Sequence, residues 1–351
     1  MSFNKTNLIG LSKPELEQAL IKIGEKPFRA KQIWQWLYFH GVTDFEAMTN
    51  LSKELRERLK QNFTLTRPKI IAEQKSADHT SKWLLEFTDG QRVETVYIPE
   101  EDRGAVCISS QVGCAVGCKF CHTGTQKLTR NLTAAEIVSQ FMTARDICQD
   151  WTIKDRKLTN IVVMGMGEPL HNIDNMIKAL NILTDPDGIA ISKRKITLST
   201  AGIADKIVPL IEAAGVKLAI SLHAPSDEKR NQIMPVNQQF PLNKLLEACQ
   251  EYQKRNGSRY ITFEYLMLKD FNDSLEDARA LVALMKRYKL GAKFNLIAFN
   301  PWADCSFEAS PRERIQAFSA EIAKGGFEAP IRVSRGQDIL AACGQLKSKK
   351  D

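Results

Sequence analysis

The feature of this chain that most restricts its fold is a regular alternation of strand and helix patterns after residue 104. Six short apolar runs have the composition of buried strands, at residues 105–109, 158–164, 195–200, 216–221, 260–266 and 292–298. Helical patterns lie between and after them, at residues 134–150, 173–184, 203–214, 242–256, 274–288 and 311–323. Apolar strands separated by helices indicate a parallel sheet that is buried on both faces. Six such units predict an α/β fold, an incomplete (β/α)6 barrel whose chemistry lies beyond the C-terminal strand ends.

The first 104 residues carry different patterns. Residues 1–65 have the periodicity of helices, and Ser12 with Glu15 predicts a capping box at the start of the first one. Three strand patterns follow, with Asp89-Gly90 as a hairpin turn between the last two. We therefore expect four parts: a helical accessory domain that binds RNA at 1–65, a β-hairpin linker or extension at 66–104, the barrel with its C-terminal loop at 105–346, and a disordered tail at 347–351.

Composition restricts the partners and the compartment only loosely. The net charge of +8 permits a polyanionic partner such as RNA. No apolar run approaches the length of a membrane span, and residues 1–10 lack the apolar core of a signal peptide. A cytoplasmic protein is therefore expected, in which the eight cysteines are metal ligands or reactive thiols rather than a disulfide framework.

Basic residues cluster in two places. The third predicted helix, at 52–63, carries Lys53, Arg56, Arg58 and Lys60. These side chains either contact RNA phosphates or form a solvated face balanced by Glu54 and Glu57. A second group is expected near the barrel mouth, where it could guide the RNA backbone: Lys193, Arg194, Lys195, His223, Arg230 and Lys269.

A cysteine motif directly follows the first barrel strand. Cys114, Cys118 and Cys121 form C-x3-C-x2-C, with a glycine just before each of the first two. Three thiolates so close together can converge on one soft-metal site. A four-iron cluster has four corners, so three cysteines leave one iron open for a ligand that is not protein. A zinc site with His122 as the fourth ligand is the alternative.

The spacing, with Phe120 before the last cysteine, resembles the radical S-adenosylmethionine (SAM) superfamily. The longer strings at 111–124 and 335–346 are similar to the branch of this superfamily that methylates adenine carbons in RNA. This resemblance covers nearly the whole chain and implies the same partial barrel. It also implies a [4Fe-4S] cluster on Cys114, Cys118 and Cys121, and the consumption of two equivalents of SAM.

The segments that follow the strands match the SAM site of the superfamily. Small residues there let a cofactor approach the backbone, and Glu168 can accept hydrogen bonds from the ammonium group of SAM. By resemblance, the residues that would line the SAM site are Gly167, Glu168, Ser199, Ser221, Leu222, His223 and Asn300.

The resemblance assigns catalytic roles to three more residues. Cys343 would accept a methyl group from one SAM and pass its carbon to the adenine, and Glu94 would take the proton from the attacked carbon. The neighbours of Cys343, Ala342 and Gly344, leave the thiol unobstructed, as a nucleophile requires. Cys107 would release the product by forming a disulfide with Cys343, which an external reductant then has to reduce.

The resemblance implies an RNA methyltransferase that acts on carbon 2 of an adenosine in 23S rRNA and of the adenosine beside the anticodon in some tRNAs. We expect a monomer that depends on an external electron donor. Three alternatives remain: methylation of carbon 8 in rRNA, as in the antibiotic-resistance branch, a non-catalytic iron–sulfur or zinc module that binds RNA, and a radical SAM reaction on a peptide or small molecule. No single residue decides between carbon 2 and carbon 8.

Overall fold

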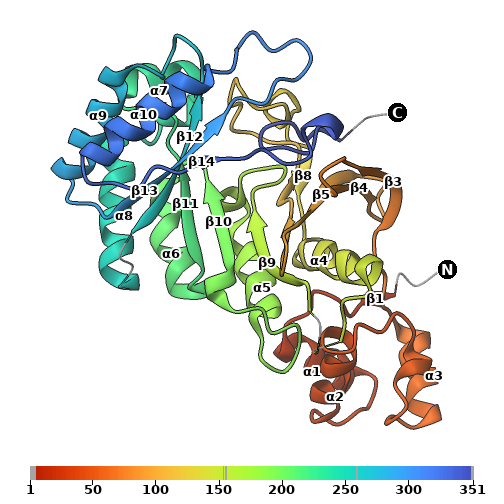
Figure 1. Cartoon of the computed structure of the whole chain (residues 1–351). Coiled ribbons are helices and arrows are strands. Elements are labelled where there is room, and N and C mark those ends of the chain that lie inside the picture. Colours follow the sequence, from red (N-terminus) through yellow and green to blue (C-terminus); the bar gives the residue numbers. More distant parts are fainter. Residues whose placement is uncertain (1–4, 153, 155, 258–259, 349–351) are drawn as a thin grey trace.

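The computed structural model describes residues 5–152, 154, 156–257 and 260–348. Its main element is a ten-stranded sheet in the order β14-β13-β12-β11-β10-β9-β6-β5-β4-β3 (Figure 1). The strands of this sheet are β3 (Lys69–Lys75), β4 (Ser81–Glu86), β5 (Arg92–Pro99), β6 (Gly104–Cys107), β9 (Leu158–Val163), β10 (Ile196–Thr200), β11 (Lys217–Ser221), β12 (Ile261–Met267), β13 (Ala292–Ala298) and β14 (Ile331–Arg332). Two small sheets pair β1 (Thr6–Asn7) with β2 (Phe63–Thr64), and β7 (Gln111–Val112) with β8 (Arg130–Asn131).

The strands β6, β9 and β10 to β14 are parallel to one another and form the partial barrel. The helices that cover the outside of the curved sheet (Figure 1) are α4 (Ala134–Cys148), α5 (Ile173–Thr184), α6 (Ala204–Ala214), α8 (Leu242–Asn256), α9 (Leu275–Arg287) and α10 (Arg312–Lys324). The short helix α7 (Asp227–Ile233) lies at the mouth, where the Ile233 carbonyl accepts a hydrogen bond from the Lys119 amide. Aromatic pairs join the layers, as where the rings of Tyr265 on β12 and Phe318 on α10 lie 5.2 Å apart. The predicted (β/α)6 fold is confirmed. The sequence patterns missed β14, because two exposed residues carry no periodicity.

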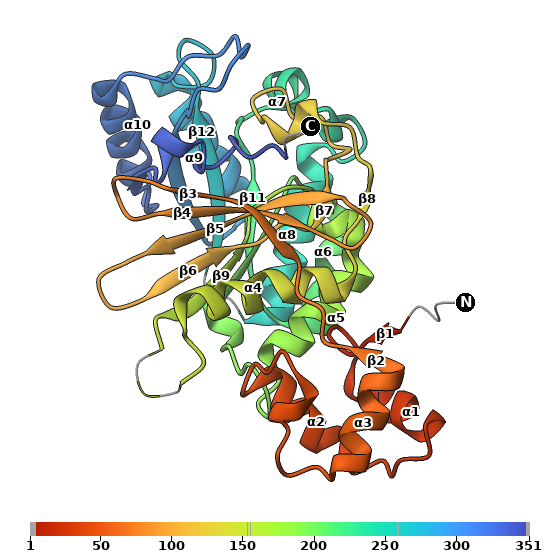
Figure 2. The ribbon, with the colours of Figure 1, turned by 90° about the vertical axis from the view of Figure 1, so that its right-hand side faces the viewer.

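The strands β3, β4 and β5 extend this sheet instead of forming a separate layer. They are antiparallel to one another, and β5 is also antiparallel to β6 (Figure 2). Residues directly opposite each other share one face of a sheet. Two rows therefore lie on the same face: Ala72, Leu84 and Glu94 form one, and Gln74, Lys82, Val96 and Cys107 form the other.

The N-terminal helices are α1 (Lys13–Lys22), α2 (Arg29–Tyr38) and α3 (Lys53–Asn62), and α1 begins with the predicted capping box. Trp34 of α2 donates a hydrogen bond to Asp185, 3.1 Å away in the turn before β10. This turn is at the amino ends of the parallel strands, so the three helices lie at the end of the barrel opposite its mouth (Figures 1 and 2). On α3, Arg56 and Lys60 both pair with Glu46.

Residues 336–348, here called the C-terminal segment, cross the barrel mouth. The segment is tied down by hydrogen bonds from Ser76 Oγ to Asp338 (2.5 Å), from the His122 amide to the Gly344 carbonyl (2.7 Å) and from Thr123 Oγ1 to the Leu346 carbonyl (2.5 Å). Lys347 and Ser348, which the sequence analysis placed in a disordered tail, also bond, to Glu94 and Gln126. Residues 349–351 of that tail lie outside the described residues.

Within the described ranges, no helix is both long and apolar enough to cross a bilayer.

Candidate active site at the mouth of the barrel

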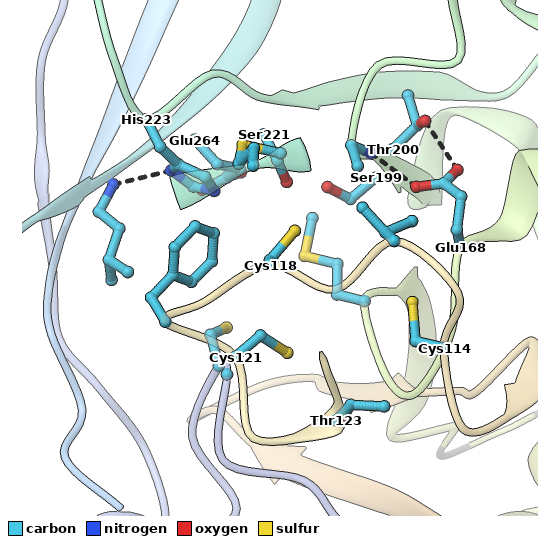
Figure 3. A pocket seen from close by; sticks show the side chains of 18 of the residues that line it. Cys114, Cys118, Cys121, Thr123, Glu168, Ser199, Thr200, Ser221, His223 and Glu264 are labelled. Carbon is cyan, nitrogen blue, oxygen red and sulfur yellow. Dashed lines mark hydrogen bonds between the residues drawn. The ribbon is translucent and has the colours of Figure 1, made fainter. Parts of the chain in front are cut away.

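Three cysteines from one loop line a single pocket at the carboxyl ends of the strands (Figure 3). Cys114, Cys118 and Cys121 follow β7, and the loop bends sharply just before the first of them. Gly113 has φ 76°, and a Cβ at this position would lie 2.1 Å from the carbonyl oxygen of Lys127. Only glycine fits such a contact, so this bend depends on its missing side chain.

The three thiols suit an iron–sulfur cluster better than a single ion. Among the described residues, no three His, Cys, Asp or Glu side chains are close enough together to hold one metal ion. A four-iron cluster is larger than one ion, so its ligands stand farther apart. His122, the alternative zinc ligand, does not line this pocket; its ring stacks on Trp302 at 4.7 Å.

The surroundings of the thiols also fit a bound cluster. Burial raises the pKa of Cys114 to about 12 and raises that of Cys118 well above its usual range. Without a metal both sulfurs therefore carry protons at neutral pH, and a cluster would replace these protons. The buried guanidinium of Arg230 lies near enough to lower the pKa of Cys118, which favours a thiolate there.

Glu168 lies across the pocket from the cysteine loop (Figure 3). Its carboxylate accepts hydrogen bonds from Thr200 Oγ1 (2.7 Å) and from the amides of Ala201 (2.7 Å) and Leu170 (2.9 Å). Burial raises the pKa of Glu168, and these three donors oppose that shift. The side chain is thereby fixed on the pocket wall, where it can accept a hydrogen bond from a bound ammonium group.

The other residues assigned to the SAM site divide into two groups. Gly167, Ser199, Ser221 and His223 line the pocket with Glu168. Leu222 and Asn300 do not belong to its lining: Leu222 is fully buried and its carbonyl accepts from Arg230, and Asn300 donates from Nδ2 to the Cys343 carbonyl at 3.1 Å. Asn300 therefore contacts the C-terminal segment in this structure.

Cys343 brings a fourth thiol to the pocket from the far end of the chain. Its side chain is exposed on the pocket wall, and its reduced contact with bulk water inside the pocket raises its pKa to about 11. Glu264 of β12 raises this pKa as well, whereas Arg332 of β14 lowers it. At neutral pH the Cys343 sulfur therefore carries its proton in the absence of a ligand.

Cys107 and Glu94 lie outside this pocket. Cys107 is buried on β6, and burial raises its pKa to about 12, with a smaller contribution from Cys343 in the same direction. Both residues are free thiols, so the structure does not support the expected disulfide. Glu94 lines a second cavity, where Lys82 Nζ lies 2.9 Å from its Oε1.

Glu264 is a pocket residue that no sequence pattern indicated. It lies in the middle of an apolar strand, and the sequence does not tell that its side chain faces the pocket. In the structure it lines the pocket beside Ser221 and His223 (Figure 3) and accepts a hydrogen bond from Asn295 at 2.9 Å.

Glu264 should make stability depend on pH. Burial raises its pKa to about 6 in the folded protein, whereas an unfolded chain keeps a value of about 4.3. The folded state binds this proton more tightly, so the resulting stability is present below about pH 4 and is lost as the pH rises through about 6. We expect the free energy of unfolding of Glu264→Gln to exceed that of the parent by about 2 kcal/mol at about pH 7.5. Near about pH 4 the two values should be equal. Urea unfolding at several pH values measures this, with the exposed Glu101→Gln as control; a difference that does not change with pH contradicts it.

Several basic residues are not where the sequence analysis placed them. Arg230 is fully buried and donates to the carbonyls of Ala201 and Ser221, so it cannot contact an RNA backbone. Lys193, Arg194 and Lys195 precede β10 and therefore lie at the amino end of the barrel, away from the mouth. These expectations were wrong for two reasons. A charge pattern does not tell that Arg230 is buried, and the three residues before β10 precede their strand, whereas the mouth lies at the carboxyl ends of the strands.

Comparisons with known proteins agree with this geometry. Residues 6–65 match the model of the ribosomal RNA large subunit methyltransferase N-terminal domain, and residues 108–282 match the radical SAM superfamily. A dual-specificity RNA methyltransferase RlmN from Rhodospirillum rubrum is 55% identical over 97% of this chain and 80% of its own length. The RlmN of Paramagnetospirillum magneticum is also 55% identical, over 99% of this chain and 77% of its own length. The chain belongs to the RlmN family.

A solved structure extends the likeness to three dimensions. A radical SAM methyltransferase from Sphaerobacter thermophilus superposes with a TM-score of 0.91 and 41% identity, covering 97% of this chain and 99% of that one. Membership of the RlmN family confirms the fold, the enzyme class and the two cofactors expected from sequence, a [4Fe-4S] cluster and SAM. The roles of individual residues stay predictions.

Proposed function

We propose that this RlmN-family enzyme methylates carbon 2 of an adenosine in 23S rRNA and of the adenosine beside the anticodon in tRNAs. The observation that carries the proposal is the shared pocket of Cys343 and the three loop cysteines. The loop cysteines and Cys343 are more than 200 positions apart in the sequence, and the barrel does not require them to be close together in order to fold. A non-catalytic RNA-binding module would have no use for an accessible fourth thiol.

In this proposal Cys114, Cys118 and Cys121 hold the cluster, and Glu168 with the serines and glycine of the opposite wall holds SAM. Bound together, these cofactors supply methyl groups and the radical chemistry needed at an adenine carbon that is too electron-poor to attack SAM directly. Cys343 contributes the sulfur that first accepts a methyl group and then presents its carbon to the base.

Glu94 and Cys107 complete the proposed residue set. Glu94 would accept the proton from the methylated carbon, and Lys82 Nζ, 2.9 Å from its Oε1, holds the carboxyl group in place. Cys107 would attack the Cys343 sulfur to release the product, since Cys343 lies near enough to contribute to the raised pKa of Cys107. The resulting disulfide needs an external reductant, and the reaction needs an external electron donor.

The remaining expectations belong to the same proposal. Residues 6–65 would serve as an accessory domain that contacts RNA, with the exposed part of α3 as its candidate surface. The enzyme would act in the cytoplasm as a monomer.

The test is a reconstitution under anaerobic conditions. Purified protein with iron and sulfide restored is given SAM, a reductant and either a 23S rRNA fragment or a tRNA, and the RNA is digested to nucleosides for mass spectrometry. We expect 2-methyladenosine in both RNAs. Methylation at carbon 8, or unmodified RNA from protein that contains iron, would contradict the proposal.

A further inference from the structure

The C-terminal segment is attached to the rest of the protein on both sides of Cys343. After Cys343, the Gly344 carbonyl accepts a hydrogen bond from the His122 amide, directly behind the last cysteine of the loop. Before Cys343, the segment is attached to the turn at residues 76–80, which joins β3 to β4 in the sheet extension. The first attachment belongs to the cofactor site, whereas the proposed reaction gives the second no role.

Two aspartates make the second attachment reciprocal. Asp78 of the turn accepts a hydrogen bond from the Gly336 amide of the segment at 3.0 Å. Asp338 of the segment accepts from Ser76 Oγ at 2.5 Å and from the Ala77 amide at 3.2 Å, both in the turn. Each carboxylate therefore holds donors of the other's stretch of chain, and the pair of aspartates is here called the aspartate clasp.

The segment and the turn approach each other closely at the clasp. Gly336 has φ 64°, and a Cβ at this position would lie 2.8 Å from the Cβ of Ala341 and 2.9 Å from Cγ2 of Thr80. Thr80 is fully buried, so it cannot move aside into solvent. Only glycine allows this approach, which shows that the clasp joins two packed stretches of chain rather than two loose ones.

Both carboxyl groups of the clasp are ionised at neutral pH. Burial opposes the ionisation of Asp78, but hydrogen bonds from Thr80 and from the Gly336 amide outweigh it and lower its pKa to about 2. The hydrogen bond from Ser76 lowers the pKa of Asp338 as well. Hydrogen bonds to an ionised acceptor are stronger than those between neutral groups, so the clasp is a firm attachment.

The clasp is close to Cys343 along the chain but outside the cofactor pocket. Only residues 339–342 separate Asp338 from Cys343. In this stretch the segment lies between the cofactor pocket, which Cys343 lines, and the second cavity, which Leu340 lines. Neither Asp78 nor Asp338 lines the cofactor pocket, so a change at the clasp should affect the position of the thiol and leave the walls of the SAM site in place.

We propose that Asp78 and Asp338 are positioning residues, whose clasp holds the C-terminal segment so that Cys343 faces the cofactor pocket and can accept the methyl group. The inference rests on the proposed function of Cys343 and goes beyond it, because it gives the turn between β3 and β4 a part in the reaction. A reacting atom displaced by about 1 Å can slow a reaction by roughly a hundredfold. Loosening the clasp should therefore slow methyl transfer to Cys343.

The test uses substitutions whose effects differ at the two aspartates. Asp78 accepts from two backbone amides, those of Gly336 and Thr80, and Asp78→Asn leaves one of them without an acceptor. Asp338→Ala removes both bonds of Asp338. Asp338→Asn should restore them, because its oxygen can accept from the Ala77 amide while its NH2 group donates to the Ser76 hydroxyl.

The matched control is Asp89→Asn in the neighbouring turn of the same sheet. Asp89 lies between β4 and β5, and its carboxylate accepts from the Gln91 amide at 3.0 Å and from Arg130 at 2.7 Å. The same substitution is thus made in a hairpin turn that is not part of the clasp.

Methyl transfer is measured on anaerobically reconstituted enzyme, with deuterium-labelled SAM at several concentrations and without RNA, by the mass of the Cys343 peptide over time. We expect Asp78→Asn and Asp338→Ala to lower the maximal rate roughly tenfold or more, with the half-saturating SAM concentration within about twofold of the parent's. Asp338→Asn and Asp89→Asn should stay within about threefold of the parent rate. The variant with both Asp78→Asn and Asp338→Ala should lose no more than the slower single variant, since both open one clasp.

Parent-like maximal rates in Asp78→Asn and Asp338→Ala would overturn the proposal. An equal loss in Asp89→Asn would overturn it as well, and so would a loss confined to the half-saturating SAM concentration, which would indicate a general effect on the fold or on the SAM site.

Hydrogen exchange of the amides at residues 336–348, measured without SAM, tests the clasp independently of the reaction. We expect faster exchange in Asp78→Asn and Asp338→Ala than in the parent, and unchanged exchange in both would overturn the proposal. If the parent never methylates Cys343 while exchange is faster in these variants, the proposed function fails and the clasp stands. If Cys343 is methylated at the parent rate in both variants, the clasp fails alone.

Discussion

Cys343→Ala should reduce RNA methylation below detection, while the protein still folds and still binds iron. The side chain is accessible on the pocket wall, so its loss should remove the sulfur that accepts the methyl group and leave the packed core unchanged. Cys118→Ala should have the same effect on methylation for another reason: it removes one of three ligands, so bound iron should also fall. Methyl transfer to RNA and iron content, measured on the same preparations, separate the two causes.

The control for both variants is Cys148→Ala, since Cys148 ends α4 away from the pocket and should retain both activity and iron. Measurable RNA methylation by Cys343→Ala would mean that the methyl group reaches the base without a protein carrier. Loss of iron from that same variant would instead make Cys343 a cluster ligand. Either result removes the central step of the proposed reaction.

Arg230→Ala should cause the largest loss of stability. The guanidinium is fully buried and holds the ends of β10 and β11 together through the carbonyls of Ala201, Ser221 and Leu222. Burial lowers its pKa to about 10, so it remains charged at neutral pH. Removing it leaves several buried acceptors unpaired, which we expect to cost ~3–5 kcal/mol and to lower the unfolding temperature by roughly 10 °C.

Thermal unfolding of the iron-loaded protein measures this, with the exposed Arg287→Ala as the control. Since Ala201 and Ser221 also line the cofactor pocket, SAM affinity should fall in Arg230→Ala as well. A variant that unfolds within about 1 °C of the parent would show that these strand ends hold their positions without the guanidinium.

Local patterns predicted the elements of the fold closely. The capping boxes of Ser12 and Thr133 mark the starts of α1 and α4 because they act within one helical turn. The turn at Asp89-Gly90 joins β4 and β5 as expected. The cysteine loop could also be recognised from the sequence, since its three cysteines lie within a stretch of eight residues that contains a glycine, with another just before it.

Residues that act across long sequence separations could not be assigned in this way. Only the family resemblance assigned a role to Cys343, because nothing near residue 343 in the sequence ties it to the cysteine loop. Glu94 likewise received its role from the resemblance alone, and only the sheet extension places it against Lys82. The sequence did not show that Glu264 lines the pocket, or that Arg230 is buried.

The sequence by itself determined the order of strands and helices, the barrel class and the position of the cysteine loop, because each depends on neighbours a few positions apart. Only the tertiary structure decided which charges are buried, which end of the barrel each loop occupies, and how the C-terminal segment divides the mouth into two cavities. Those features arise where distant segments pack together, and burial and pairing, which set the charge state of a side chain, exist only after that packing.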